Sequence, residues 1–334
     1  MRIIIDAMGG DNAPAEIVKG AVMAKQRLGV EVTLVGRVED VRACLENEGC
    51  TEIDIVDARE VISMEDDPST ATRRKKDSSM AVALNLLKEG KGDAVVSAGS
   101  TGALLTGATL IVKRINGIRR AALAPVLPNG GKGVVLIDSG ANVDCTPEYL
   151  LQFAYMGSFY ARTMLGLENP RVGLANVGTE DTKGGVLQHE TFQLLKAAGE
   201  AGRINFIGNV EGNGVFSGDV DVLVADGFTG NLMLKTAESM IKFMMGNLKS
   251  VFYNNLKNKL AAAVLKGDLA QMKKMLDVKE VGGTVMLGIS RPVIKAHGSS
   301  DARCILAAVR QAVTCVNSGI TEEIKANIEY MKIG

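Results

Sequence analysis

The chain has 334 residues, of which 46% are hydrophobic, so it can bury a large core as one α/β unit or as two coupled subdomains. Lys plus Arg and Asp plus Glu both number 38, a balance that argues against nucleic-acid binding through bulk positive charge. The five cysteines form no CxxC pair, which fits a reduced cytosolic protein, and no apolar run reaches the roughly 18 residues of a membrane-spanning helix. We therefore expect a soluble protein, or at most one peripheral to a membrane.

Short β-branched runs alternate with helical periodicity along most of the chain, a rhythm that predicts a mostly parallel sheet with helices on both faces. The predicted strands are, in chain order, Arg2 to Asp6, Glu31 to Val35, Ile53 to Asp57, Ala94 to Ser97, Val134 to Asp138, Arg171 to Ala175, Ile204 to Ile207, Val222 to Ala225 and Pro292 to Lys295. No low-complexity linker interrupts them. The sequence therefore predicts one unit over residues 1–334, within which two subdomains can be coupled.

Glycine and small polar residues follow the predicted strands at seven junctions: DAMGGDN, SAGSTGA, DSGAN, ANVGTEDTKGG, GNVEGNG, ADGFTGN and AHGSS. In a parallel sheet these junctions all lie at the carboxyl edge, where glycine lets backbone N–H groups approach an anion. Any one of them is equally well explained as a tight turn. The whole set favours a functional crevice.

The segment 238–276 differs, because it contains successive amphipathic helices with no strand between them and is rich in methionine. Soft methionine side chains suit a surface that accepts a flexible apolar chain, and the segment could contact lipid. A dimer interface or an ordinary core explains the same periodicity.

Several familiar sites are absent from the sequence. There is no GxGxxG after the first strand, no GxxxxGK[ST], no GxSxG and no HExxH, and the chain has only two histidines. Cys145 could be a thiol nucleophile, although a buried cysteine without a catalytic role is the simpler interpretation. Backbone donors with few charges and no evident covalent nucleophile suit an enzyme whose nucleophile is an anionic substrate.

Seven motifs resemble, in the same order, those of the bacterial phosphate acyltransferases of phospholipid synthesis: DAMGGD at 6–11, RRKKDSSM at 73–80, SAGSTGA at 97–103, DSGAN at 138–142, NVGTEDTKG at 176–184, ADGFTGN at 225–231 and KAHGSS at 295–300. The resemblance runs nearly end to end. Ser100 and Ser139 depart from the pattern, where Asn and Val are more usual, and loops tolerate both changes.

The resemblance implies a three-layer α/β/α fold related to phosphotransacetylases and to isocitrate and isopropylmalate dehydrogenases. It implies transfer of a long-chain fatty acyl group from acyl carrier protein to inorganic phosphate, by direct attack of phosphate on the thioester. It also implies a homodimer with no metal or other cofactor, a cytoplasmic location at the inner face of the cell membrane, and delivery of the acyl phosphate to a glycerol-3-phosphate acyltransferase.

Site residues follow from these motifs as hypotheses. Four residues are predicted to be catalytic: Lys183, His297, Asp226 and Asn231. Lys183 would be the cation that balances the charge of phosphate and of the oxyanion. His297 would donate a proton to the thiolate or form a hydrogen bond with phosphate. Phosphate is expected over Gly9 and Gly10, Ser100, Thr101 and Gly102, and Thr229 and Gly230, with Asp6, Asp11 and Asn142 orienting loops and donors. The alternatives are a solvated Lys183, a purely structural His297, and a role as ordinary helix N-caps for Asp6, Asp11, Asn142 and Asp226.

The densest basic cluster, Arg73, Arg74, Lys75 and Lys76, could dock an acidic acyl carrier protein or its phosphopantetheine arm. A solvated run of charge is the usual explanation of such a stretch.

Two other functions stay open. A dehydrogenase on the related fold would bind NADH, although no motif supports it, and a peripheral membrane scaffold without catalysis would use the segment 238–276 as its foot.

Overall fold

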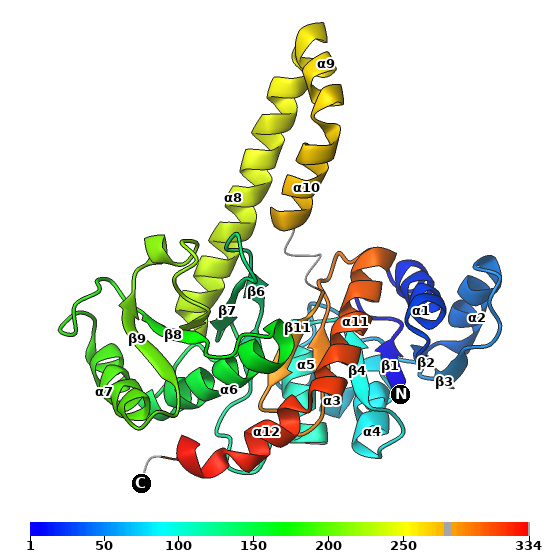
Figure 1. The fold of residues 1–334 in the computed structure, drawn as a ribbon. Helices are drawn as coiled ribbons and strands as arrows, with labels where there is room; N and C mark the ends of the chain where they lie inside the picture. The colour runs from blue at the N-terminus through cyan, green and yellow to red at the C-terminus, as the bar shows by residue number, and fades with distance from the viewer. Residues whose placement is uncertain (277–281, 333–334) are drawn as a thin grey trace.

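The computed structural model describes residues 1–276 and 282–332, whose strands form two sheets (Figure 1). The seven-stranded first sheet has the order β3-β2-β1-β4-β12-β11-β5, with bounds Asp54–Asp57, Glu31–Gly36, Arg2–Asp6, Ala94–Ser97, Val293–Lys295, Thr284–Leu287 and Ala122–Ala124. The five-stranded second sheet has the order β6-β7-β10-β8-β9, with bounds Val126–Leu127, Val134–Ile137, Val222–Val224, Arg171–Ala175 and Asn205–Val210.

Helices connect most of these strands. Their bounds are Ala15–Leu28 (α1), Val38–Asn47 (α2), Ala71–Arg74 (α3), Ser79–Lys88 (α4), Thr101–Gly107 (α5, continued by a π-helix over Ala108–Val112), Pro147–Leu165 (α6), Val186–Glu200 (α7), Gly227–Tyr253 (α8), Leu256–Val264 (α9), Lys266–Leu276 (α10), Ala302–Ser318 (α11) and Ile320–Ala326 (α12).

The first sheet is covered on both faces, and β1 shows why. Ile3 and Ile5 pack in one core with residues of α1 and α11, whereas Ile4 packs in a separate core with Leu84 and Leu87 of α4. Because successive strand side chains point to opposite faces, an unbroken apolar run is the pattern of a strand buried on both sides. The prediction of a mostly parallel α/β fold is confirmed.

The second sheet shares its core with the first through α6. Every residue from Leu150 to Ala161 is buried, because the second sheet covers one side of the helix and α11 and α12 pack against it elsewhere. A helix buried all round carries apolar residues on every face, as this one does. On its other face the second sheet packs Leu136 and Leu223 against Met233 and Leu234 of α8.

The nine predicted strands are present as β1 to β4, β7 to β10 and β12, within a few residues of their expected bounds. They divide over two sheets, however, rather than the one sheet assumed for the seven glycine junctions. Three short strands that the sequence did not reveal, β5, β6 and β11, make the antiparallel pairs β11 with β12, β11 with β5 and β6 with β7. They have two to four residues each, although length alone does not explain why they were missed, because the predicted strands β10 and β12 have three residues each.

Helices α8, α9 and α10 form an arm that projects from the two sheets (Figure 1). This arm includes the predicted helical segment 238–276 but begins earlier, at Gly227. Apolar side chains are exposed along it, among them Phe243 at 67%, Leu256 at 73% and Val264 at 84% of their full surface. Within the described residues no single helix is long and apolar enough to cross a membrane, and α11 with α12 meets that test only as a pair bent by 42°.

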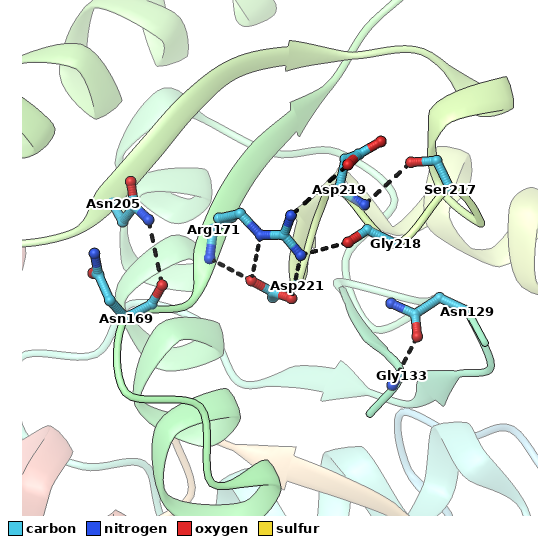
Figure 2. A network of polar contacts seen from close by, with 9 residues as sticks. All are labelled: Asn129, Gly133, Asn169, Arg171, Asn205, Ser217, Gly218, Asp219 and Asp221. Carbon is cyan, nitrogen blue, oxygen red and sulfur yellow. Dashed lines mark hydrogen bonds and ion pairs between the residues drawn. The ribbon is translucent and has the colours of Figure 1, made fainter. Parts of the chain in front are cut away.

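A polar network at the amino edge of the second sheet fixes the register of β8 beside β10 (Figure 2). The backbone N–H and Nε of Arg171 donate to Asp221 Oδ2 at 2.8 and 2.9 Å, and its Nη2 donates to Asp221 Oδ1 at 3.0 Å. Burial raises the pKa of Asp221, but the hydrogen bonds and charge of Arg171 outweigh it, so the pKa lies below its ordinary value. This ion pair therefore stabilises the fold above the ordinary pKa of aspartate and loses that effect as pH falls through the folded value.

Arg171→Ala should lower the free energy of unfolding by about 1–3 kcal/mol, because it leaves a mostly buried carboxylate without its partner. Urea unfolding at pH 7 measures the loss, and the difference from the unaltered chain should shrink at acidic pH. Lys325→Ala, which breaks the exposed pair with Glu322, is the matched control and should cost much less. Equal losses in the two variants would contradict the assignment.

Candidate active site

A cavity of about 800 Å³ lies where the carboxyl ends of the two sheets meet. Five of the seven glycine junctions contribute to its lining, three from the first sheet and two from the second: Met8, Gly10 and Asp11 after β1, Ala98 to Thr101 after β4, Ala296 to Gly298 and Ser300 after β12, Ser139 after β7, and Asn231 after β10. Its volume is in the range of small-molecule binding sites. The junctions ANVGTEDTKGG and GNVEGNG, after β8 and β9, do not line it.

Asp6 ties together the loops that follow β1 and β4. Its carboxylate is 1% exposed, and Oδ2 accepts a hydrogen bond from Ser97 Oγ at 2.6 Å. Ser97 Oγ in turn accepts from the backbone N–H of Gly99 at 3.1 Å. Burial raises the pKa of Asp6, and the hydrogen bonds it accepts oppose the shift. Asp6 therefore does not line the cavity itself, but its hydrogen bonds hold the loops that do.

The loop after β12 is joined to the loop after β1 by the backbone. Asp11 N–H donates to Gly298 O at 2.8 Å, and Asn12 Nδ2 donates to Ser300 O at 3.2 Å. Gly10 has a φ of +105° and lies so close to Gly298 O that a Cβ would be 2.9 Å from it. Only glycine fits there without strain, so the sequence GG in the first junction serves this close approach.

Lys295, the last residue of β12, supplies the cavity with a partly buried cation. Its Nζ donates to Ala98 O at 3.4 Å and to Ala296 O. Burial lowers the pKa of Lys295 to about 8, an effect that nearby Lys235 increases and that Asp6 and Asp11 oppose. An ammonium held in this way has lost part of its hydration and is available to a bound anion.

In the second sheet, Asp138 holds the turn DSGAN. This fully buried carboxylate accepts hydrogen bonds from the backbone N–H of Leu123 at 2.9 Å, Ala141 at 3.0 Å and Asn142 at 2.7 Å. Asn142 Nδ2 donates to Asp138 Oδ2 at 3.0 Å and to Ala121 O at 2.8 Å. The turn thereby fastens β7 to β5, the point at which the two sheets join.

The start of α8 packs on that same turn. Asp226 caps the helix, accepting from Thr229 N–H and from Thr229 Oγ1, both at 2.8 Å, and Gly227 N–H donates to Asn142 O at 2.7 Å. A Cβ on Gly230 would overlap Asp138 O, so glycine there allows the helix to lie against the turn. This packing brings Asn231 and Lys235 to the cavity.

The predicted site residues fall into three groups. Those that line the cavity are Gly10, Asp11, Ser100, Thr101, Asn231 and His297. Those that belong to the same loops without lining it are Asp6, Gly9, Gly102, Asn142, Asp226, Thr229 and Gly230. The catalytic and binding roles given to all of them stay predictions.

Lys183 forms the third group by itself. It lies in the loop between β8 and α7, outside the cavity lining, with its side chain 49% exposed and its Nζ 4.0 Å from Glu180 Oε1. Its predicted role as the balancing cation stays untested, and among the described residues the lysines that line the cavity are Lys235, Lys242 and Lys295.

Three residues of the site, Lys295, Lys235 and Asp138, were not predicted from the sequence. Lys295 could have been predicted, because it is the last residue of a predicted strand and the first residue of the motif KAHGSS. Lys235 lies four residues after Asn231, which places both on one side of α8 once the helix is known to start at Gly227. The stretch Val61 to Met64, which lines the cavity, carries no motif at all.

The basic cluster at 73–76 divides by exposure. Arg73, Arg74 and Lys76 are exposed, whereas Lys75 turns inward and its Nζ donates to Val61 O at 2.9 Å and to Asp66 Oδ2 at 2.6 Å. Lys75 thus fastens the segment that forms part of the cavity wall. The predicted docking surface therefore has three exposed side chains.

Cys145 lies outside the cavity lining, and burial raises its pKa to about 12, which makes it a poor nucleophile. Cys304, at the start of α11, does line the cavity. Over residues 1–276 and 282–332, no group of three or more His, Cys, Asp or Glu is arranged to hold a metal ion.

Residues 1–323 match the sequence model of a family described as "Fatty acid synthesis protein". The chain is 47% identical over 334 residues to a phosphate acyltransferase of Anoxybacillus flavithermus, covering 99% of this chain and 100% of the relative. It belongs to the phosphate acyltransferase family. The phosphate acyltransferases of Geobacillus thermodenitrificans and Clostridium acetobutylicum are 48% and 45% identical, over 98% and 99% of this chain and 99% and 100% of those proteins. The family predicted from the seven motifs is confirmed.

Solved structures place the fold of this phosphate acyltransferase family member among the phosphotransacetylases. A phosphotransacetylase from Streptococcus pyogenes superposes with a TM-score of 0.61 at 18% identity, covering 95% of this chain and 94% of that one. A branched-chain phosphotransacylase from Enterococcus faecalis superposes with a TM-score of 0.54 at 16% identity, over 95% and 99%. The predicted relation to the phosphotransacetylase fold is therefore confirmed.

Lys295→Met should weaken the binding of inorganic phosphate by roughly 10- to 100-fold, because a hydrogen bond to a charged group contributes about 1.5–3 kcal/mol. In the unaltered protein the affinity should fall as pH rises past about 8, where Lys295 loses its proton. Lys295→Arg keeps its charge at high pH and should lose this step. Calorimetric titration at pH 7 and at pH 9.5 measures both effects, and an identical pH profile in all three proteins would contradict the role of Lys295.

Proposed function

We propose that this enzyme transfers a long-chain fatty acyl group from acyl carrier protein to inorganic phosphate. One observation supports it most directly: a single cavity joins a polar end, where Lys235 and Lys295 lie beside backbone and hydroxyl donors, to a wall of apolar side chains. Such a cavity suits a small anion and an apolar acyl chain at the same time. The family supplies the reaction, since its members compared above are phosphate acyltransferases.

In the proposed reaction, an oxygen of phosphate attacks the carbonyl carbon of the thioester directly. A C–O bond forms, the C–S bond breaks, and the pantetheine sulfur leaves as a thiolate that takes up one proton, so the products are acyl phosphate and the free carrier thiol. Lys295 and Lys235 would hold phosphate, and the first turn of α5, which begins at Thr101, would offer its N–H groups. Orientation and charge stabilisation carry the catalysis.

His297 is our proposed proton donor to the thiolate. Its ring is exposed at the cavity, and Nδ1 lies 3.0 Å from Ser299 Oγ, an interaction that orients the imidazole. Because a thiolate is already a fair leaving group, loss of this proton donor should matter less than loss of the phosphate-binding cation.

The partners and the location belong to the same proposal. Apolar side chains exposed on the arm, such as Phe243 and Leu256, support contact with a second copy of the chain in a homodimer, with the inner face of the cell membrane, or with both. An enzyme held at the membrane could pass its reactive acyl phosphate to a membrane-bound glycerol-3-phosphate acyltransferase. No cofactor takes part in the proposed reaction.

The test is to incubate the protein with palmitoyl carrier protein and phosphate and to trap the product with hydroxylamine. Hydroxamate should form faster when enzyme and phosphate are both present than when either is omitted, a comparison that subtracts the slow direct attack of hydroxylamine on the thioester. Cys304→Ser should keep this phosphate-dependent rate, because direct attack needs no thiol on the enzyme. Absence of phosphate-dependent hydroxamate with folded protein would favour the scaffold without catalysis. Phosphate-independent loss of the thioester that disappears in Cys304→Ser would instead indicate a covalent mechanism.

Reversing two charges, in Arg73→Glu with Arg74→Glu, should raise the KM for acyl carrier protein roughly threefold or more at low salt, because an acidic carrier is attracted to exposed cations. The difference should shrink in high salt. Lys325→Glu with Lys332→Glu, the same change of net charge at the far end of the chain, is the control. If both pairs give the same KM, the basic cluster does not dock the carrier.

A further inference from the structure

One side of α8 lines the cavity over more than three turns of the helix. The residues that contribute are Asn231, Leu234, Lys235, Glu238, Ile241, Lys242 and Met245. Their spacing of three and four residues is that of a single helical face. Since the cavity follows this face, it is elongated along α8.

The character of the face changes along its length. The polar end has Asn231 and Lys235, whose Nζ lies 3.0 Å from Glu238 Oε2. Ile241 and Met245 follow, and both are half-buried. Lys242 is exposed, so its charged group can stay in solvent while its aliphatic stem covers apolar surface.

A second segment completes the apolar part of the lining. It consists of Val61, Ile62, Ser63 and Met64, and its backbone is fixed. Lys75 Nζ binds Val61 O at 2.9 Å, and Asp66 Oδ2 accepts from both Lys75 Nζ and the Ser63 N–H, at 2.6 and 2.7 Å. These hydrogen bonds at Val61 and Ser63 hold the backbone of this part of the wall in place.

The length of this cavity-lining face matches a long acyl chain. From Asn231 to Met245 the helix rises by about 21 Å at 1.5 Å per residue. A C–C bond of about 1.5 Å advances an extended chain by about 1.3 Å, so the face accommodates about 16 bonds, enough for a palmitoyl chain. An acetyl group would use only its polar end.

We propose that the acyl chain of the donor lies along this face of α8, with its carbonyl carbon near Asn231 and Lys235, and that Met245 limits the length of chain accepted. The inference rests on the proposed function and deepens it, because it assigns the residue that selects the substrate by length. A lipid surface or a second copy of the chain would instead meet the exposed side of α8, where Met244 is 58% exposed and does not line the cavity.

Two tryptophan substitutions test the order of positions along the face. Met245→Trp should lower kcat/KM for palmitoyl carrier protein by about 10-fold or more while leaving octanoyl carrier protein nearly unaffected, since blocked methylene sites in an apolar pocket have effects of this size. Ile241→Trp, one turn nearer the polar end, should in addition reject the dodecanoyl donor. Met245→Ala removes the side chain proposed to limit chain length and should shift the preference toward stearoyl carrier protein. This variant keeps the test decisive if a tryptophan variant does not fold.

Met244→Trp is the matched control, with the same substitution one residue away on the exposed side of α8. It should keep the length profile of the unaltered enzyme, even if contact with a membrane or a second copy changes. A length profile that is the same in Met245→Trp, Met245→Ala and the unaltered enzyme would overturn the inference while the proposed function stands. Absence of phosphate-dependent hydroxamate from every donor in the unaltered enzyme would overturn the proposed function itself.

Discussion

Two buried carboxylates, Asp6 and Asp138, hold the strand ends from which the cavity is built. Asp6 is the last residue of β1 and Asp138 directly follows β7. Each accepts a hydrogen bond from another strand, Asp6 from Ser97 Oγ and Asp138 from the backbone N–H of Leu123. Burial raises the pKa of both groups, and the bonds they accept offset part of its effect. Because a buried carboxylate without partners would be strongly unfavourable, these bonds fix the loops in one arrangement.

The charge of the cavity depends on that arrangement. Asp6 and Asp11 favour the protonated state of Lys295, whereas burial and Lys235 disfavour it, which leaves an ammonium near its titration point. A partly desolvated ammonium of this kind binds an anion more strongly than a fully hydrated one does. Asp6 lies outside the cavity lining, whereas Asp11 is part of it, and both carboxylates favour the charged form of Lys295.

Helix α8 links this polar end to the rest of the molecule. Its first turn is fastened to the DSGAN turn by Asp226, Gly227 and Gly230, and its later turns leave the sheets as one side of the arm (Figure 1). One helix therefore brings both Asn231 and Met245 to the cavity lining. In the proposed function, this helix sets the distance between the reacting carbonyl and the end of the acyl chain.

The sequence by itself determined nine of the strands, the glycine junctions and the family, because apolar runs, turn residues and ordered motifs are local signals. Tertiary structure alone decided which junctions meet. The strands divide over two sheets, and of the second sheet only the junctions after β7 and β10 reach the cavity, so Lys183, after β8, lies outside it while Lys295 lies inside it. The tertiary structure also decided that Lys75, unlike its exposed neighbours, bonds to Val61 and Asp66. These outcomes depend on hydrogen bonds and burial between residues far apart in the chain, which leave no periodic pattern in the sequence around either partner.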